Sequence, residues 1–265
     1  MSRVGRPDVV VMPEASLTPL QYEHVKTYLA GEGIPLIAGI VEDESPKNPK
    51  LGKNYAAIDF PFLGAEILEF EVSIQQPKHH RWKIESSQIE TYGLANQLNP
   101  NKVWWEGICV EDRSLNFLVL RDWLCSCVMI CEDLARIDPA GQFVRSIAPD
   151  LVIALLFDDP QIPTRWPAHH ATVLADDPGS SVLTLSCLGM TKLSRPVHLT
   201  GNNESCNFIG MWRDPRKGHV PIRIPSGKEA AILTITRSTT ACETADGRTN
   251  AINAGAPKFA GLNYV

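Results

Sequence analysis

The sequence has no strong excess of either charge and no long hydrophobic run. Its 25 Lys and Arg face 30 Asp and Glu, a net charge of −5 in 265 residues. Proteins that bind nucleic acid need basic side chains to neutralise phosphates, so this balance argues against a nucleic-acid partner. The longest apolar run, Leu151–Phe157, is far shorter than the roughly 20 residues of a membrane-spanning helix. The first apolar run stops at Pro13, too early for a secretory signal, so we expect a cytoplasmic protein without a membrane span.

Paired cysteine motifs are also missing. The chain has 7 cysteines, an odd number, and in a reducing compartment they are expected to be thiols. Cys125, Cys127 and Cys131 lie close together, but their spacing does not match the paired ligands of a zinc knuckle. We therefore expect no metal site, and most of these cysteines are expected to be small buried residues.

The hydrophobic pattern indicates an α/β fold. Short continuous apolar runs are typical of strands that are covered on both faces. Helices are expected at Thr18–Gly31 and Thr164–Asp176, between such runs. Residues 1–245 are expected to form one domain, and 246–265, rich in Ala, Gly and Asn, a tail. The predicted strands are Val9–Met12, Pro35–Val41, Tyr55–Ile58, Val72–Ile74, Leu118–Leu120, Val128–Ile130, Leu151–Leu156, Val182–Ser186, Cys206–Met211 and Ala231–Ile235.

Three of the predicted strands end close to a chemically reactive side chain. They lead to Glu14, Lys78 and Cys131, and open α/β sheets build their sites at the carboxyl ends of strands. Each residue also has a purely structural interpretation. Glu14 can complement the dipole of the following helix, Lys78 can belong to the solvated basic stretch KHHRWK, and Cys131 can be a core thiol. Their occurrence together favours a catalytic site.

Taken in chain order, PDVVVMPEASL, QPKHHRW and VMICEDLA resemble the Glu-Lys-Cys motifs of the nitrilase (carbon–nitrogen hydrolase) superfamily. The resemblance extends over about residues 7–236, and the ICED form is most similar to glutaminase-type members. It implies a four-layer α-β-β-α sandwich. Members usually have a further strand and helix before the glutamate strand, and the resemblance implies that these two elements are missing before Glu14 here. They commonly pair as homodimers.

The resemblance implies a hydrolase that acts on non-peptide carbon–nitrogen bonds through a cysteine thioester. An ordinary thiol has a pKa of about 8.5, so a nearby carboxylate is needed to take its proton. Glu14 would be this base, Cys131 the nucleophile, and Lys78 would stabilise the oxyanion together with the backbone N–H that follows Cys131. The products are a carboxylic acid and ammonia or an amine. The substrate is a small amide, with a nitrile left open, and no metal or organic cofactor is required.

Several assignments keep alternatives. Lys83 lies five residues from Lys78 and competes with it as the catalytic lysine. A second glutamate often follows the lysine in the family, and Glu90 is expected to fill this place, with Glu85 as the alternative.

Further supporting residues are expected around the nucleophile. Glu132 follows Cys131 directly, and Arg165 and Trp166 are expected to line the substrate pocket.

Two other functions stay open. A degenerate domain of the same fold would bind a ligand or partner without catalysis. A Cys-His hydrolase would instead use His169 or His170 as its base.

Overall fold

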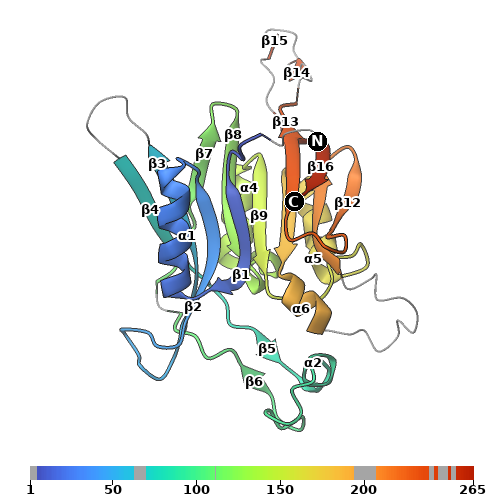
Figure 1. The fold of residues 1–265 in the computed structure, drawn as a ribbon. Coiled ribbons are helices and arrows are strands. Elements are labelled where there is room, and N and C mark those ends of the chain that lie inside the picture. The colour runs from blue at the N-terminus through green and yellow to red at the C-terminus, as the bar shows by residue number, and fades with distance from the viewer. Residues whose placement is uncertain are drawn as a thin grey trace. The chain divides into compact units, whose positions relative to one another are not determined.

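The computed structural model describes residues 5–62, 70–110, 112–193, 207–238, 242–243, 250–251 and 255–265. The chain divides into two compact units, residues 1–114 with 155–157 and residues 115–154 with 158–265. Both combine strands with helices, so the chain is α/β as predicted (Figure 1). Within the described ranges, no helix is long and apolar enough to cross a membrane.

The first unit is built on a four-stranded sheet with the order β1-β2-β3-β4. β1 is parallel to β2, and β3 is antiparallel to both β2 and β4, so β1, β2 and β4 run in the same direction. The end of β4 therefore lies at the same edge of the sheet as the start of β3. The elements of this unit are β1 (Val10–Leu17), α1 (Pro19–Gly31), β2 (Leu36–Glu42), β3 (Lys53–Phe62), β4 (Phe70–Pro77), β5 (Lys83–Ile84), α2 (Ser86–Thr91) and β6 (Trp104–Trp105).

Helix α1 begins and ends where the sequence places its signals. The Thr18 hydroxyl accepts a hydrogen bond from the Gln21 N–H, and the Gln21 side chain accepts one from the Thr18 N–H, which completes a capping box. Pro19 occupies the first helical position, where a missing N–H does no harm. The chain leaves the helix through Gly33, whose φ of 62° favours glycine. These signals confirm the predicted helix.

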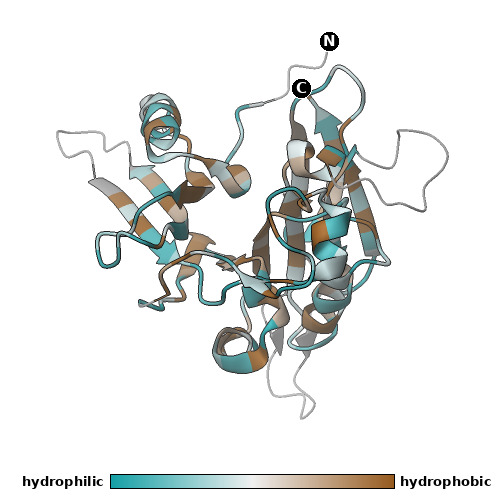
Figure 2. Ribbon diagram, turned by 90° about the horizontal axis from the view of Figure 1, so that it is seen from below, coloured by the Kyte–Doolittle hydropathy of each residue, from teal (hydrophilic) through white to brown (hydrophobic). Residues whose placement is uncertain are grey.

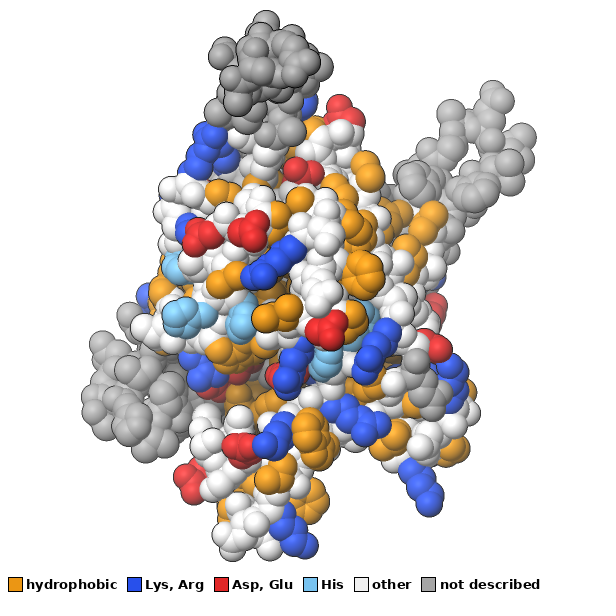
Figure 3. All heavy atoms as spheres, turned by 180° about the vertical axis from the view of Figure 1, so that it is seen from behind, with side chains coloured by type: hydrophobic (Ala, Val, Ile, Leu, Met, Phe, Trp, Pro, Cys, Tyr) orange, Lys and Arg blue, Asp and Glu red, His pale blue; other side chains and the backbone are white. Residues whose placement is uncertain are grey.

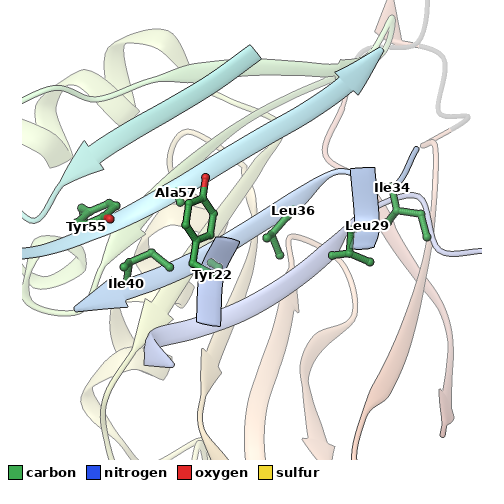
Figure 4. Packing of buried hydrophobic residues seen from close by; sticks show 8 residues of the cluster. Tyr22, Leu29, Ile34, Leu36, Ile40, Tyr55 and Ala57 are labelled. Atoms are coloured by element: carbon green, nitrogen blue, oxygen red, sulfur yellow. The ribbon is translucent and has the colours of Figure 1, made fainter. Parts of the chain in front are cut away.

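The core of the first unit lies between α1 and the sheet (Figure 4). Tyr22 and Leu29 of α1 pack on the alternate residues Leu36 and Ile40 of β2. Tyr22 is also bound through its hydroxyl, which donates to Asp59 Oδ2 at 2.8 Å. Burial and this hydrogen bond raise the pKa of Tyr22 to about 12, so it stays a neutral donor at neutral pH.

The second unit contains the larger sheet, of six strands in the order β12-β11-β10-β9-β8-β7. Helix α5 packs on β10 and β11. The elements of the second unit are β7 (Phe117–Arg121), β8 (Leu124–Ile130), α3 (Glu132–Ala135), a π-helical turn (Ile137–Gly141), α4 (Gln142–Ile147), β9 (Leu151–Leu156), α5 (Trp166–Asp176), β10 (Ser181–Ser186), α6 (Leu188–Leu193), β11 (Phe208–Asp214), β12 (Gly218–Arg223), β13 (Ala231–Thr236), β14 (Cys242–Glu243), β15 (Asn250–Ala251) and β16 (Lys258–Tyr264).

Strands β8, β9 and β10 start at one edge of this sheet. The N–H of Cys125, at the start of β8, donates to the Asp150 carboxylate, and the N–H of Ser181, at the start of β10, donates to the Asp150 carbonyl. Asp150 directly precedes β9. The three strands are therefore parallel, and their carboxyl ends meet at the opposite edge, where Cys131 follows β8.

The predicted tail contains a strand. β16 pairs antiparallel with β13 from Ala231↔Tyr264 to Thr236↔Lys258.

Apolar residues give the strands much of the brown colour in Figure 2, while the connecting loops are mostly polar. On the face shown in Figure 3, Lys and Arg side chains are interspersed with Asp and Glu.

Candidate functional site

Glu14 lies on a bulge of β1. The sequence places it after the strand, but β1 continues to Leu17, and its pairing with β2 is irregular between Met12 and Leu17. The next residue, Ala15, has a φ of 51°, which is uncommon for a residue other than glycine. Glu14 is only 1% exposed. The bulge thus carries a carboxylate into the protein interior.

Lys78 lies between two carboxylates. It directly follows β4, which extends three residues beyond the predicted strand Val72–Ile74, and its side chain is 2% exposed. Its Nζ lies 2.8 Å from Glu14 Oε1 and 2.6 Å from Glu106 Oε2. An ammonium group in this position neutralises one of the two negative charges and donates hydrogen bonds to both carboxylates.

Asn54, at the start of β3, holds the same two carboxylates. Its Nδ2 donates to Glu14 Oε1 at 2.7 Å and to Glu106 Oε1 at 2.9 Å. The Lys78 N–H donates to the Asn54 carbonyl at 2.8 Å, which fixes the end of β4 beside the start of β3. Three buried side chains and the half-buried Glu106 form one polar group, which we call the Glu-Lys cluster: Glu14, Asn54, Lys78 and Glu106.

Burial favours proton uptake by Glu14. It raises the pKa of Glu14 above its ordinary value of 4.5; the Lys78 ammonium opposes this shift, the nearby Glu106 carboxylate adds to it, and the hydrogen bonds from Lys78 and Asn54 oppose it. Glu14 Oε2 is buried without a hydrogen-bond partner in the described part of the chain. Glu14 therefore has an unused acceptor and a pKa moved toward neutrality, which suits a group that exchanges protons.

Cys131 occupies a strained turn in the second unit. It directly follows β8, as predicted, and precedes the short helix α3. Its φ of 45° and ψ of −107° are unusual for a residue with a side chain. Strain of this kind is typical of a sharp turn from strand to helix that presents a nucleophile.

The carboxyl edge of β8, β9 and β10 also carries Asp158 and Arg165. The Asp158 N–H donates to Ser186 Oγ, and Ser186 Oγ donates to the Asp158 carbonyl, so the ends of β9 and β10 meet there. Arg165 Nη2 lies 2.8 Å from both Asp158 Oδ1 and Asp159 Oδ2. This ion-paired group belongs to the same edge as Cys131.

Trp166 and the two histidines lie on α5. Trp166 begins the helix and contacts the His170 ring edge-on, with centroids 5.8 Å apart. Burial lowers the pKa of His170, whereas His169 is exposed. The role of Arg165 and Trp166 as pocket residues stays a prediction.

The second glutamate beside Lys78 is Glu106 rather than Glu90. Glu90 lies exposed on α2, and Glu85, the alternative, pairs with Lys83 at the surface. Glu106 instead contacts Lys78 and accepts a hydrogen bond from the Trp82 N–H at 3.0 Å. The geometry also separates the two lysines, since the buried Lys78 meets Glu14 and the exposed Lys83 does not.

Glu132 pairs with Arg136. Its Oε1 lies 2.5 Å from Arg136 Nη2, one turn further along the chain. A supporting role for Glu132 stays a prediction.

Sequence reasoning missed Glu106 because no buried strand leads to it. Glu106 follows β6, which has only two residues, in the stretch VWWEGI. The signal that could have identified Glu106 is that it is a single acidic residue among apolar ones in this stretch. Asn54 stands at the head of a strand that the sequence identified, without a role assigned to it.

The described residues include no group of three or more His, Cys, Asp or Glu side chains placed to hold a metal ion. Five of the described cysteines are thiols outside any disulfide: Cys109, Cys125, Cys127, Cys131 and Cys187. Cys206, at the start of one predicted strand, lies outside the described residues.

Comparison of the sequence with protein-family models and with curated proteins gives no match. Solved structures do resemble it. Nit3 of Saccharomyces cerevisiae, a member of branch 10 of the nitrilase superfamily, is 15% identical, with 82% of this chain and 72% of that one covered and a TM-score of 0.47. The NitFhit protein of C. elegans is 13% identical, with 80% and 48% covered and a TM-score of 0.50.

A third similar structure is the glutamine-dependent NAD+ synthetase of Acinetobacter baumannii. It is 16% identical, 68% of this chain is covered, and the TM-score is 0.40. The match spans only 31% of the synthetase, which is therefore a much longer protein. At these identities the likeness concerns the fold alone, and the α/β fold of this chain is similar to that of NitFhit.

Proposed function

We propose that the protein hydrolyses the carbon–nitrogen bond of a small non-peptide amide through a thioester on Cys131. The observation that carries this proposal is the Glu-Lys cluster, in which a buried lysine lies 2.8 Å from one carboxylate and 2.6 Å from another. Buried ion pairs are costly to build and are weak stabilisers, so a functional role is the better explanation for this one.

The chemistry begins with proton transfer. Glu14 takes the proton of the Cys131 thiol, and the thiolate attacks the amide carbonyl carbon. The resulting oxyanion accepts hydrogen bonds from the Lys78 ammonium and from the Glu132 N–H. This step requires the Cys131 sulfur to come within hydrogen-bond reach of Glu14.

The second half regenerates the thiol. Glu14 returns its proton to the leaving nitrogen as the carbon–nitrogen bond breaks, and ammonia or an amine departs. Glu14 then takes a proton from water, which attacks the thioester carbonyl. The carbon–sulfur bond breaks, the carboxylic acid leaves, and Cys131 recovers its proton. Glu106 and Asn54 hold Glu14 and Lys78 in place through this cycle.

A partition experiment tests the thioester. Two amides with the same acyl group, one releasing ammonia and one releasing methylamine, are hydrolysed in the presence of hydroxylamine. A shared acyl-enzyme must divide between water and hydroxylamine in the same proportion, so we expect one hydroxamate-to-acid ratio for both amides. Ratios that differ between the two amides, or hydrolysis with no hydroxamate formed, would contradict a common thioester.

A further inference from the structure

We propose that Gly39 of β2 is a positioning residue for Glu14, because only a residue without a side chain leaves room for the bulge that carries Glu14. The inference deepens the proposed function, since it concerns how that function's base is held. It uses only residues of the first unit.

The strand register places the bulge opposite Gly39. Met12 pairs with Ala38, and Leu17 pairs with Ile40. Between these two pairs β1 advances by five residues (17 − 12) and β2 by two (40 − 38), so β1 contains three extra residues. Gly39 is the one β2 residue between the pairs, and it faces the whole bulge.

A side chain at position 39 has no space. A Cβ atom on Gly39 would lie 2.4 Å from the Glu14 Cα, 2.5 Å from the Pro13 carbonyl oxygen and 2.9 Å from the Ala15 nitrogen. All three are backbone atoms, which cannot rotate away as a side chain can. The bulge, including Glu14, would have to move.

The displacement would break the contacts of Glu14. In the sheet order, β2 lies between β1 and β3, yet Glu14 accepts a hydrogen bond from Asn54 of β3. Neighbouring strands are about 4.8 Å apart, so the Glu14 side chain must cross β2. Because the bulge approaches Gly39 closely, the distance that the Glu14 side chain must span to reach Asn54 is shorter. Ser16 Oγ donates to the Gly39 carbonyl at 3.2 Å and so holds the bulge against β2.

The test compares Gly39→Ala with two other glycine variants. In Gly31→Ala the new Cβ meets no atom within 4 Å, which controls for the substitution itself. In Gly210→Ala it meets the Thr184 carbonyl oxygen of the second unit at 2.6 Å, which controls for strain in a sheet. Two quantities are measured in each variant: the titration of Glu14, by carboxyl-carbon NMR with Glu14→Gln to assign the signal, and the rate of Cys131 alkylation at pH 7.

We expect Gly39→Ala to return the Glu14 midpoint toward 4.5 and to slow Cys131 alkylation by about 10–10²-fold. Gly31→Ala and Gly210→Ala should leave both quantities unchanged, even if Gly210→Ala is less stable. Should Gly39→Ala not fold, Ser16→Ala removes the Ser16–Gly39 hydrogen bond without adding atoms and should shift both quantities in the same direction by less.

The outcomes separate this inference from the proposed function. If Glu14→Gln leaves Cys131 alkylation unchanged, Glu14 is not the base, and the positioning role is decided by the NMR titration alone. If Glu14 titrates in Gly39→Ala as in the native protein, the positioning role is overturned, whatever the alkylation rates.

Discussion

Replacing Cys131 with Ala is expected to lower the rate of ammonia release from an amide by at least about 10³-fold. The variant lacks the proposed nucleophile, so no thioester can form. Any remaining rate would come from binding and from oxyanion stabilisation alone. The measurement is steady-state ammonia release, with the best substrate from a panel of short-chain amides.

Cys125→Ala is the matched control. Cys125 lies on β8, the strand that leads to Cys131, and is half-buried. Its removal should change the rate by less than about twofold, since surface and core changes away from a site affect stability more than chemistry. Equal activity of Cys131→Ala and the native protein would rule out a cysteine thioester. A native protein that hydrolyses no amide or nitrile would favour the non-catalytic binding domain.

Replacing Lys78 with Met is expected to lower the free energy of unfolding by about 3–5 kcal/mol at neutral pH. The substitution keeps an unbranched side chain, one atom shorter, but leaves Glu14 and Glu106 without their cation. Glu14 is 1% exposed, so water cannot take the place of the ammonium group. Urea unfolding followed by tryptophan fluorescence measures the change.

The loss of unfolding free energy in Lys78→Met should depend on pH in a defined direction. Without Lys78, the pKa of Glu14 rises further above its ordinary value of 4.5, because the attraction that lowers it is gone. A carboxyl group with a raised folded-state pKa stabilises the fold fully below its unfolded pKa, and this contribution is lost as the pH rises through the folded-state value. The deficit of Lys78→Met should therefore be smallest near pH 4.5 and should grow toward pH 8.

Lys83→Met separates this effect from the loss of any lysine. Lys83 pairs with Glu85, and both side chains are largely exposed, at 44% and 51%. Exposed ion pairs contribute about 0–1 kcal/mol, so this variant should unfold almost as the native protein does. A loss for Lys83→Met equal to that for Lys78→Met would contradict the assignment of Lys78 to the buried cluster.

The sequence predicted the strands well because their runs are short, apolar and continuous. Leu151–Leu156 is one example, and it coincides with β9. β12 was missed because GHVPIR contains a proline and few apolar residues, and β16 because KFAGLNY was assigned to a tail. In both cases the pairing partner, β11 or β13, fixes the strand, and the pattern of the segment itself is weak.

The site was only partly predictable for a related reason. The predicted strand before Cys131 ends at Ile130, as β8 does, whereas the predicted strand before Lys78 ends at Ile74, three residues before the end of β4. The sequence identifies Glu14 as a candidate site residue. It does not predict the bulge that carries Glu14, because a bulge depends on the register of β1 with β2. Glu106 meets Lys78, and Asn54 meets Glu14, through side-chain contacts between segments that lie 28 and 40 residues apart in the chain. No local pattern encodes such contacts.

The most direct test of the account is the rate of Cys131 alkylation by iodoacetamide against pH, in the native protein and in Glu14→Gln, followed by peptide mass spectrometry. Cys125 and Cys127 serve as internal controls, because burial raises the pKa of both thiols and should keep them slow. We predict that Cys131 reacts much faster than either, with a midpoint below about pH 8.5, and that Glu14→Gln moves this midpoint upward. A Cys131 that reacts no faster than Cys125, with a profile unchanged in Glu14→Gln, would contradict the assignment of Glu14 and Cys131 as base and nucleophile.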